Sequence, residues 1–222
     1  MSRLFVITIG FDEKFPLRAV VRRGISPGDR VLLLTAHPID ERNQKAISMF
    51  KRMLNNLVEN VKIEVLEVPV EDLPKAVKKI RSKVNELKTA QIELNLSGGM
   101  RALFLEVLLA LVSMPIISDV PIEVELEDGR AVITAWLSWF RAPIPSYEDL
   151  IIMRAISEKG FTTLDELVDH FTEDIEGVQI VKYPRSTLHR KLSKLVKAGL
   201  VSISRKGRKA YYQLTKLGEM HI

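Results

Sequence analysis

Residues 3–114 alternate four times between a short apolar run and a longer segment with helical spacing. The apolar runs are rich in branched and aromatic side chains, as strands are, and cover residues 3–9, 30–36, 61–68 and 91–97. Strands that alternate with helices predict a mainly parallel sheet with right-handed crossovers and helices on both faces. The fold class predicted for this part of the chain is therefore α/β and Rossmann-like.

The helices between these strands differ in how much of their surface is apolar. The first is expected over Phe11–Arg23, and the inward face of the second is expected to run from Ile47 through Leu57 and Val58. The fourth helix, which ends near Met114, is apolar almost all round. Such a helix must be buried, either in the core or in a subunit interface.

A hairpin is expected to close the first domain, because Asp128-Gly129 separates two alternating runs within Ile122–Leu137. Alternation places the acidic residues outward and the apolar ones inward, namely Glu123, Glu125 and Glu127 against Val124 and Leu126. Closely spaced prolines then mark a linker. We therefore expect one domain over residues 1–140, a linker over 141–146 and a second domain over 147–222.

The second domain begins with three helical segments. Two of them open with capping signals, Ser146 with Asp149 and Thr163 with Glu166. The third is expected over Pro184–Ala198, because proline suits a first helical turn and leucines recur on one face. The segment before it, 171–183, is longer than the usual turn of a helix-turn-helix, so either the second helix runs on or a short extra element intervenes.

Two strand-like runs follow and flank a basic tip at residues 205–209. Three helices and a basic hairpin predict an α+β winged helix-turn-helix fold. Residues 184–209 contain nine Lys or Arg and no acid, whereas residues 147–176 contain nine acids and two bases. A charged helix face can be simply solvated, but this polarity, together with a net charge of +5, favours double-stranded DNA as a partner.

The third helix and the basic hairpin around residues 205–209, which would be the wing of this fold, supply the candidate DNA contacts. Residues that point away from the leucine face suit base edges, namely Arg185, Ser186, His189, Arg190 and Ser193. Cations at the end of the helix and in the wing suit phosphates, namely Lys194, Lys197, Arg205, Arg208 and Lys209. The stretch 186–201 resembles the recognition helix of winged helix-turn-helix regulators of the multiple-antibiotic-resistance type.

The loops after the first and fourth strands are the candidate ligand site, because open α/β sheets bind ligands beyond the strand ends where the winding reverses. Gly98-Gly99 lets backbone approach a ligand, and the helix N-terminus that follows favours an anion, which Arg101 can also contact. The glycine pair could equally be an ordinary strand-to-helix turn. The polar residues Thr8, Asn95 and Ser97 at comparable strand ends favour the ligand site.

Composition limits the chemistry. With no cysteine and four scattered histidines, neither a disulfide nor a metal site is expected. Neither loop has the glycine pattern of a dinucleotide site, and no Walker lysine motif occurs, so no nicotinamide cofactor or nucleoside triphosphate is expected. The longest apolar run, Val107–Ile117, is too short to span a membrane, and no signal-peptide cleavage site is evident. A cytoplasmic location is expected.

With both loops and both domains considered, the chain resembles the CRISPR-associated Rossmann fold (CARF) family, specifically its archaeal Csa-type regulators with a winged helix. The resemblance covers essentially the whole chain and rests on Gly10-Phe11 and on the stretch from Asn95 to Arg101. It implies a homodimer whose paired CARF domains form one pocket for a regulatory cyclic oligoadenylate, expected to be cyclic tetra-adenylate. The family's regulators act at CRISPR-related promoters, in antiviral defence.

The resemblance also implies which residues contact the ligand, namely Thr8, Gly10, Phe11, Asn95, Ser97, Gly98, Gly99, Met100 and Arg101. His37 and Arg42, after the second strand, are weaker candidates, and His37 reads equally well as a loop residue that faces solvent.

Two other functions stay open. Some CARF domains cleave their own ligand without a metal, with the ribose 2′-hydroxyl as nucleophile, and Ser97 and Arg101 would be the candidates for this. No catalytic acid–base pair is evident in the sequence, so an enzyme is not expected. The other function is an adaptor that docks on a CRISPR effector, and the acid-free basic stretch argues against it.

Overall fold

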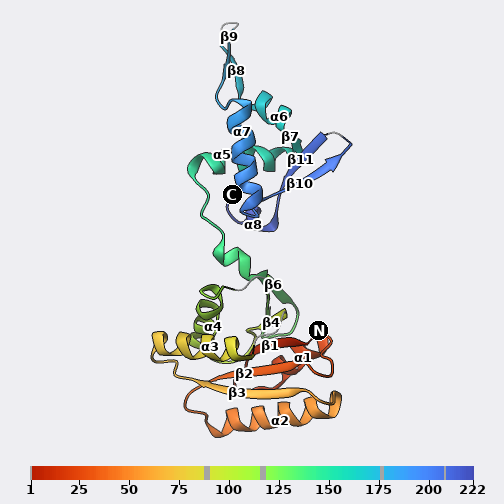
Figure 1. The fold of residues 1–222 in the computed structure, drawn as a ribbon, viewed down its shortest axis with the longest axis vertical. Coiled ribbons are helices and arrows are strands. Elements are labelled where there is room, and N and C mark those ends of the chain that lie inside the picture. The colour runs from red at the N-terminus through yellow and green to blue at the C-terminus, as the bar shows by residue number, and fades with distance from the viewer. Residues whose placement is uncertain (1, 88–90, 116–118, 176–177, 208) are drawn as a thin grey trace. The chain divides into compact units, whose positions relative to one another are not determined.

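The computed structural model describes residues 2–87, 91–115, 119–175, 178–207 and 209–222. The chain divides into two compact units, Met1–Arg141 and Ala142–Ile222, whose elements are labelled in Figure 1.

The first unit contains a six-stranded sheet. Its strands are β1 (Arg3–Thr8), β2 (Arg30–Ala36), β3 (Lys62–Val68), β4 (Gln91–Asn95), β5 (Pro121–Glu125) and β6 (Val132–Trp136). Their order is β3-β2-β1-β4-β5-β6, with the first five parallel and β6 antiparallel to β5. The prediction of a Rossmann-like, mainly parallel sheet with a terminal hairpin is confirmed.

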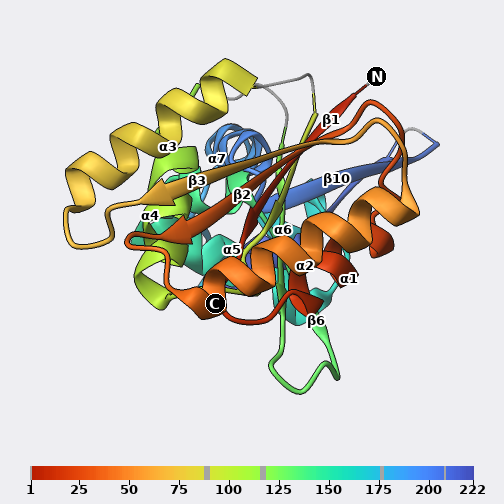
Figure 2. The same ribbon diagram turned by 90° about the horizontal axis from the view of Figure 1, so that it is seen from below.

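Helices cover both faces of this sheet. They are α1 (Lys14–Arg22), α2 (Glu41–Leu57), α3 (Leu73–Leu87) and α4 (Arg101–Val112), followed by the 3-10 helix η1 (Leu137–Arg141). Because strand side chains alternate, Phe5 and Ile7 of β1 pack on the α1 and α2 side, while Leu4 and Val6 pack on the α3 and α4 side. Figure 2 shows the sheet between the two helical layers.

The winding of the sheet reverses at β1. The chain runs from β1 through β2 to β3 and returns on the other side of β1 as β4. The carboxyl ends of β1 and β4 therefore lie side by side, with Ile7 in register with Asn95. This is the place where open α/β sheets bind ligands.

Two expectations for the helices of this unit are wrong. The first helix begins at Lys14 and not at Phe11, because the side chain of Asp12 accepts the backbone N–H of Lys14 at 2.9 Å and holds the preceding residues in a loop. The inward face of α2 ends at Leu54. Leu57 is 57% exposed in the last turn, and Val58 has left the helix with an extended backbone.

The apolar helix α4 is only partly covered. One face, including Leu103 and Val107, is fully buried in the core, whereas Leu105 and Leu109 are 50% and 40% exposed. The core therefore accounts for only part of the apolar surface of this helix.

The second unit contains four helices and five short strands among its described residues. The helices are α5 (Tyr147–Lys159), α6 (Leu164–His170), α7 (Arg185–Lys197) and α8 (Lys216–Glu219). The strands are β7 (Thr162–Thr163), β8 (Thr172–Ile175), β9 (Val178–Val181), β10 (Val201–Lys206) and β11 (Lys209–Leu214). They form one sheet in the order β10-β11-β7 and a separate hairpin, β8–β9.

Side-chain hydrogen bonds cap the first turns of two of these helices, as predicted. The Ser146 hydroxyl accepts the backbone N–H of Asp149 at 3.3 Å, and Asp149 accepts that of Ser146 at 3.1 Å. Thr163 and Glu166 form the same reciprocal pair at the start of α6. Each cap satisfies amide groups that the helix leaves free, which contributes about 1 kcal/mol.

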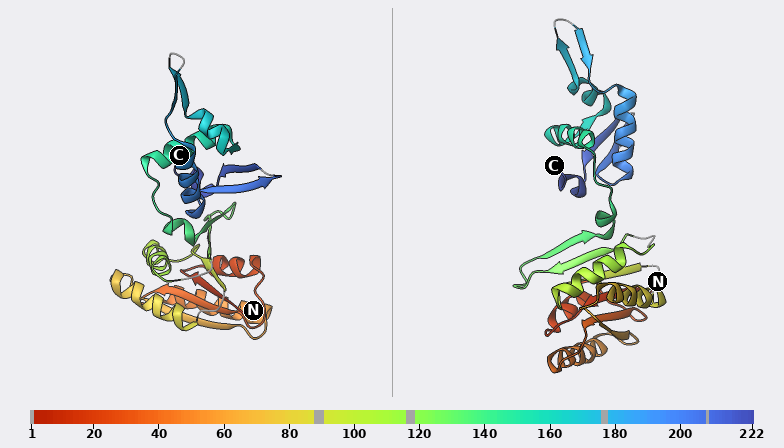
Figure 3. Two further views of the ribbon diagram at one scale, coloured as in Figure 1. Left: turned by 45° about the horizontal axis from the view of Figure 1, so that its top comes forward. Right: turned by 90° about the vertical axis from the view of Figure 1, so that its left-hand side faces the viewer.

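The long segment between α6 and α7 contains an extra element. Residues 172–175 and 178–181 pair as the antiparallel hairpin β8–β9, which projects from the rest of its unit in Figure 3. Of the two alternatives left open by the sequence, the intervening element is the observed one, and α6 ends at His170.

Candidate functional site

At the reversal point, the loops after β1 and β4 are in backbone contact. A Cβ atom on Gly10 would lie 3.0 Å from the Cα of Gly99, and one on Gly98 would lie 2.9 Å from the carbonyl oxygen of Thr8. Gly99 also has a φ of +86°, a conformation that side chains rarely adopt. These glycines are therefore required for one loop to pack on the other.

A hollow of about 690 Å³ opens beside these two loops. Its volume lies in the range of small-molecule sites. Six of the nine predicted ligand contacts line it, namely Gly10, Phe11, Ser97, Gly98, Gly99 and Met100. The structure thus brings residues from both predicted motifs to one concave site.

The other three predicted contacts lie elsewhere. Thr8 and Asn95 are buried at the ends of their strands, beneath the loops, and Arg101 is exposed at the first position of α4 without lining the hollow. The side-chain oxygen of Asn95 accepts the backbone N–H of Ser97 at 3.2 Å. Asn95 therefore shapes the loop from below, because its strand position turns the side chain inward.

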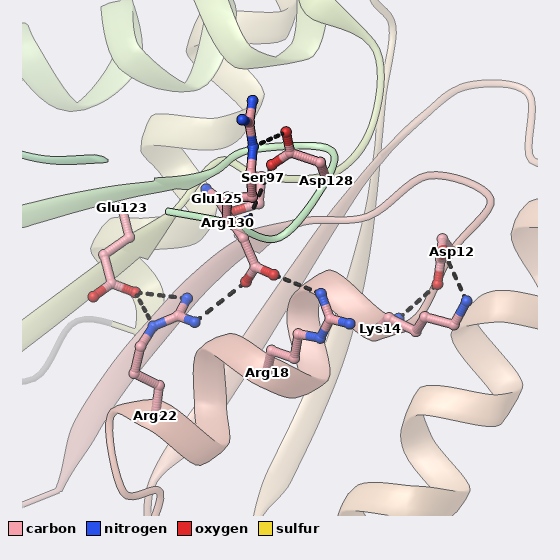
Figure 4. Close-up of polar contacts among 9 residues, drawn as sticks. All are labelled: Asp12, Lys14, Arg18, Arg22, Ser97, Glu123, Glu125, Asp128 and Arg130. Atoms are coloured by element: carbon pink, nitrogen blue, oxygen red, sulfur yellow. Dashed lines mark hydrogen bonds and ion pairs between the residues drawn. The ribbon is translucent and has the colours of Figure 1, made fainter. Parts of the chain in front are cut away.

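Ser97 connects the second loop to the neighbouring strand. Its hydroxyl accepts the backbone N–H of Glu125 at 2.9 Å, as Figure 4 shows. No acceptor for its own hydroxyl hydrogen is found in the described part of the chain. A hydroxyl held in this way, on the lining of the hollow, can donate to a ligand.

Next to these loops, arginines of α1 form ion pairs with glutamates of β5 (Figure 4). Arg18 lies 2.7 Å from one carboxylate oxygen of Glu125, and Arg22 lies 3.2 Å from the other and 3.3 Å from Glu123. The expectation that these glutamates point outward is wrong. Each is 6% exposed, because α1 covers that face of β5 and supplies the opposite charge.

This ion-pair network ties together the two loops that line the hollow. The helix α1 follows the loop that contains Gly10, and Glu125 is the residue whose N–H binds Ser97 in the other loop. The glutamates are buried, whereas the side chains of Arg18 and Arg22 are 52% and 33% exposed. Removing an arginine would leave a buried carboxylate without its compensating charge, which is costly. The relative position of the two loops therefore depends on the arginines of α1.

Sequence reasoning missed two residues at the start of α2 that line the hollow, Asp40 and Asn43. Asn43 lines it, is 8% exposed, and has a side-chain oxygen without a hydrogen-bond partner among the described residues. Asp40 also lines it and caps α2 by accepting the backbone N–H of Asn43 at 2.8 Å. Arg42 is exposed and does not line the hollow. The signal that could have found this part is its position after β2, a strand next to the reversal point.

The charge of the lining differs from the expectation of an anion site. Four carboxylates line the hollow, and no lysine or arginine of the described chain does, the acids being Asp12, Asp40, Glu71 and Glu127. The cationic candidate Arg101 lies outside it. The hollow itself is therefore an acidic environment.

His37 is the weaker candidate that the structure does place on the hollow. Its Nδ1 lies 2.8 Å from a carboxylate oxygen of Glu67, which is near the end of β3. When Nδ1 donates to the carboxylate, Nε2 is left as a hydrogen-bond acceptor. Both side chains are more than 40% exposed.

In the second unit, the predicted DNA contacts lie on α7 and on the hairpin β10–β11. The helix α7 buries three leucines, and its exposed residues include Arg185, Ser186, His189, Arg190 and Lys197. Ser193 is half-buried, and its hydroxyl donates to the carbonyl of His189 at 2.8 Å. Arg205 and Lys209 are exposed in the hairpin, and Arg208 lies outside the described residues.

Some of these cations are engaged by acids of the same unit. Lys194 lies 3.1 Å from Asp149, which is 1% exposed, and Arg185 pairs with Asp165. Burial on its own would raise the pKa of Asp149, but hydrogen bonds from Ser146 and Lys194 outweigh it, so that pKa lies below its ordinary value. Arg190 and Lys197 have no ion pair within the described part of the unit, and their charges stay available.

The described residues show neither a metal cluster nor a membrane-spanning helix. No group of three or more His, Cys, Asp or Glu among them could hold a metal ion. None of the helices in the described ranges is both long enough and apolar enough to cross a membrane.

The strand order, the reversal point and the hollow define a Rossmann-like domain with a ligand-sized site between its first and fourth strands. Residues 3–136 match the family model of the Csa3 CRISPR-associated Rossmann-like domain. The chain belongs to this family, and CRISPR-associated ligand sensing is the role of such a domain. The CARF part of the resemblance seen in the sequence is confirmed.

Other comparisons add little. Among solved structures, the crystal structure of a possible transcriptional regulator for arsenical resistance is 27% identical, over 32% of this chain and 62% of that chain, with a TM-score of 0.25. The chain thus spans less than two thirds of that protein, and a TM-score this low does not establish a shared fold. Curated protein sequences contain no match.

Proposed function

We propose that this protein is a ligand-responsive transcription regulator of CRISPR-related genes, which senses a cyclic oligoadenylate with its first unit and binds double-stranded DNA with its second. The observation that carries the proposal is the hollow at the reversal point of a CARF-family sheet. The same chain continues into a helix and hairpin with nine bases and no acid. A sensor and a DNA-binding surface in one chain are the two parts that a regulator needs.

The ligand in this proposal is cyclic tetra-adenylate, and its phosphates lie at the start of α4. Met100 precedes this helix and makes no side-chain cap, so the amide groups of the first turn are free to bind an anion. Arg101 is exposed at the first helical position and adds a charge-assisted bond. Glycine at positions 98 and 99 keeps this approach open.

A second copy of the chain is the proposed partner of the first unit. The exposed leucines of α4 are one part of the surface that it covers. Ile133 of the edge strand β6 is another, at 55% exposed, and it shares a strand face with Ala135, which packs on the α3 and α4 core. A two-fold dimer would bring two identical loops to one ring, and it would match the spacing of DNA half-sites.

The second unit reads DNA with α7 and grips it with the wing. Exposed side chains on α7 suit base edges in the major groove, and the cations of the hairpin suit the phosphates beside it. The support for this is the burial of the leucine face, which leaves Arg190 and Lys197 on the outside of the helix.

Calorimetry with cyclic tetra-adenylate, followed by a gel shift with promoter DNA, tests the proposal. We expect saturation at one ring per two chains and a change in DNA affinity when the ring is bound. Linear tetra-adenylate is the matched control, because it has the same bases and lacks the closed ring. No binding of the ring, or no effect of the ring on DNA affinity, would contradict the function.

Cleavage of the bound ring is the second candidate function, and the His37–Glu67 pair favours it. In this reaction the ribose 2′-oxygen bonds to the adjacent phosphorus, and the bond from phosphorus to the 5′-oxygen breaks. His37 would take the 2′-hydroxyl proton, and the 5′-oxygen would take a proton from water, which leaves a 2′,3′-cyclic phosphate and a 5′-hydroxyl.

Chromatography of radiolabelled ring after incubation separates a binder from a nuclease. Linear products that disappear in His37→Gln but persist in Arg42→Gln would support cleavage by the pair. An intact ring after many binding lifetimes would leave sensing as the function of the hollow.

A further inference from the structure

We infer that Asp165 of α6 is a positioning residue for DNA recognition, which holds the guanidinium of Arg185 so that this arginine reads a guanine base. The inference rests on the proposed DNA binding of the second unit, and it adds an acid to a surface for which only cations and hydroxyls were predicted. Three observations carry it, namely the place of the pair at the start of α7, its exposure, and the donors that Arg185 has left.

The pair lies where a recognition helix meets the bases. Arg185 is the first residue of α7, and its Nη1 donates to a carboxylate oxygen of Asp165, in the first turn of α6. In helix-turn-helix proteins the N-terminal residues of the second helix contact base edges, while the first helix crosses the DNA backbone. The two partners therefore belong to the two helices that a duplex would contact together.

Stability does not account for this pair. The side chains of Arg185 and Asp165 are 61% and 69% exposed, and an ion pair in solvent contributes little to the free energy of unfolding. A cation at the start of a helix is unfavourable for that helix, because the free amide groups already carry a partial positive charge. Asp165 is not the cap of α6 either, since Thr163 and Glu166 form it. A contact with DNA gives this arginine a role that the fold does not.

The hydrogen bond leaves one edge of the guanidinium for the base. Arginine has five N–H donors in a fixed plane, and within the described residues only Nη1 of Arg185 has a partner. The remaining edge, formed by Nε and Nη2, presents two donors side by side, which match the O6 and N7 acceptors of guanine in the major groove. A carboxylate that already fixes the plane reduces the conformational entropy lost on binding. Asp165 thus acts through Arg185.

The negative charge of Asp165 adds to the discrimination between sequences. Close to a duplex, a carboxylate repels phosphates whatever the sequence, so it weakens binding to every DNA. At the cognate guanine, the arginine that it orients gains a bidentate contact, which offsets the repulsion. The pair therefore lowers the affinity for random DNA more than the affinity for the promoter, and it raises the ratio between the two.

Gel shifts of the full, ligand-free chain test the inference on promoter duplexes in which each G·C pair is replaced in turn by A·T. Arg185→Ala should remove the discrimination at one of these pairs, a loss of about 10- to 100-fold. Asp165→Asn should lower the discrimination at the same pair by about two- to fivefold and raise the affinity for scrambled DNA. The matched control is Asp169→Asn, exposed on the same helix without an ion pair in the described chain, which should raise both affinities alike.

The double variant separates positioning from simple charge. Because Asp165 acts through Arg185, adding Asp165→Asn to Arg185→Ala should cause no further loss of discrimination. If Asp165 only stabilised the first turn of α6, Asp165→Asn would lower the stability of the unit, measured by tyrosine absorbance, and leave the discrimination at every pair unchanged. That result, or equal effects of Asp165→Asn and Asp169→Asn on both DNAs, would overturn the inference while the proposed function stood. A wild-type chain that does not bind promoter DNA at all would instead overturn the proposed function, and the inference with it.

Discussion

The hollow of the first unit and the outer face of α7 with the hairpin β10–β11 both meet nucleotides in the proposed function, yet their charges are opposite. Carboxylates line the hollow without a lysine or arginine from the described chain, whereas residues 184–209 have nine bases and no acid. A nucleotide has an uncharged base and a negatively charged phosphate, so the two regions suit different parts of it. An acidic, aromatic hollow suits the base, and a basic surface suits the phosphate.

The two regions also differ in how they are built. The hollow depends on backbone contact between glycine loops and on buried residues from several strand ends. The face of α7 is a single helix held by its leucines, with its functional groups at the ends of side chains. We therefore expect the hollow to be sensitive to small steric changes, and the α7 face to be sensitive to salt and charge.

The largest expected difference between the two regions is in the salt dependence of their binding affinities. With six or more phosphate contacts, DNA affinity should fall by about a thousandfold between 50 mM and 200 mM salt, because bound counterions are released. Binding of cyclic tetra-adenylate should change only severalfold over the same range. Fluorescence anisotropy with labelled DNA and with labelled ring measures both. Equally steep slopes would show that the ring, too, is bound mainly through its phosphates.

The substitution Gly98→Val should have the next largest effect, and only on the first unit. A side chain there would collide with the carbonyl oxygen of Thr8, since a Cβ atom alone would lie 2.9 Å from it. We expect a loss of about 3 kcal/mol in the free energy of unfolding of that unit and loss of ring binding. Ligand-free DNA binding should persist.

Fluorescence can follow this unit by itself, because both tryptophans, Trp136 and Trp139, belong to it. Ala102→Val places the same valine side chain at an exposed position of α4 and serves as the control. If Gly98→Val unfolded no earlier than this control, the loops would not depend on their close contact.

A single arginine should show that the α7 face reads bases as well as phosphates. Arg190→Ala should cost roughly 1 to 3 kcal/mol at the specific site and little on random DNA, because a bidentate contact to guanine is lost. Lys209→Ala, in the hairpin β10–β11, should weaken binding to both DNAs alike and lower the salt slope by about 0.9. Gel shifts on promoter and scrambled duplexes measure the contrast, and equal losses for Arg190→Ala would remove its role as a base reader.

Local patterns predicted much of this fold. Arg30–Ala36 is a strand with the predicted bounds, and the pairs at Ser146 and Thr163 form as expected, because a cap involves residues three apart. The burial of Glu123 and Glu125 depends on arginines about a hundred residues away in the sequence. The alternation of residues along one strand cannot reveal these distant partners. The rule of alternation assumes a solvated face, and α1 removes that condition.

The candidate site was predicted in outline. The rule of strand ends located both loops, and six of their residues line the hollow. It missed Asn43, because a polar residue in the first turn of a helix looks like an ordinary surface position. It did not show that Arg101 lies outside the lining of the hollow, because sequence adjacency to a loop does not show which way the first turn of a helix points.

The smallest expected effect concerns the acid that holds part of the α7 face. Because hydrogen bonds keep the pKa of Asp149 below its ordinary value of 3.8, its charge stabilises the second unit above that pH, and the contribution is lost as the pH falls further. Asp149→Asn should therefore lower the free energy of unfolding of this unit by about 1 kcal/mol at pH 7 and flatten its decline below pH 4. All four tyrosines belong to this unit, so tyrosine absorbance follows its unfolding, and Glu158→Gln, exposed on the same helix, is the control.

Asp149→Asn also releases Lys194, which should steepen the salt slope of DNA binding by up to about 0.9. If stability fell but the slope did not change, Lys194 would already reach the DNA despite its partner, and the acids of α5 would have no part in shaping the basic surface.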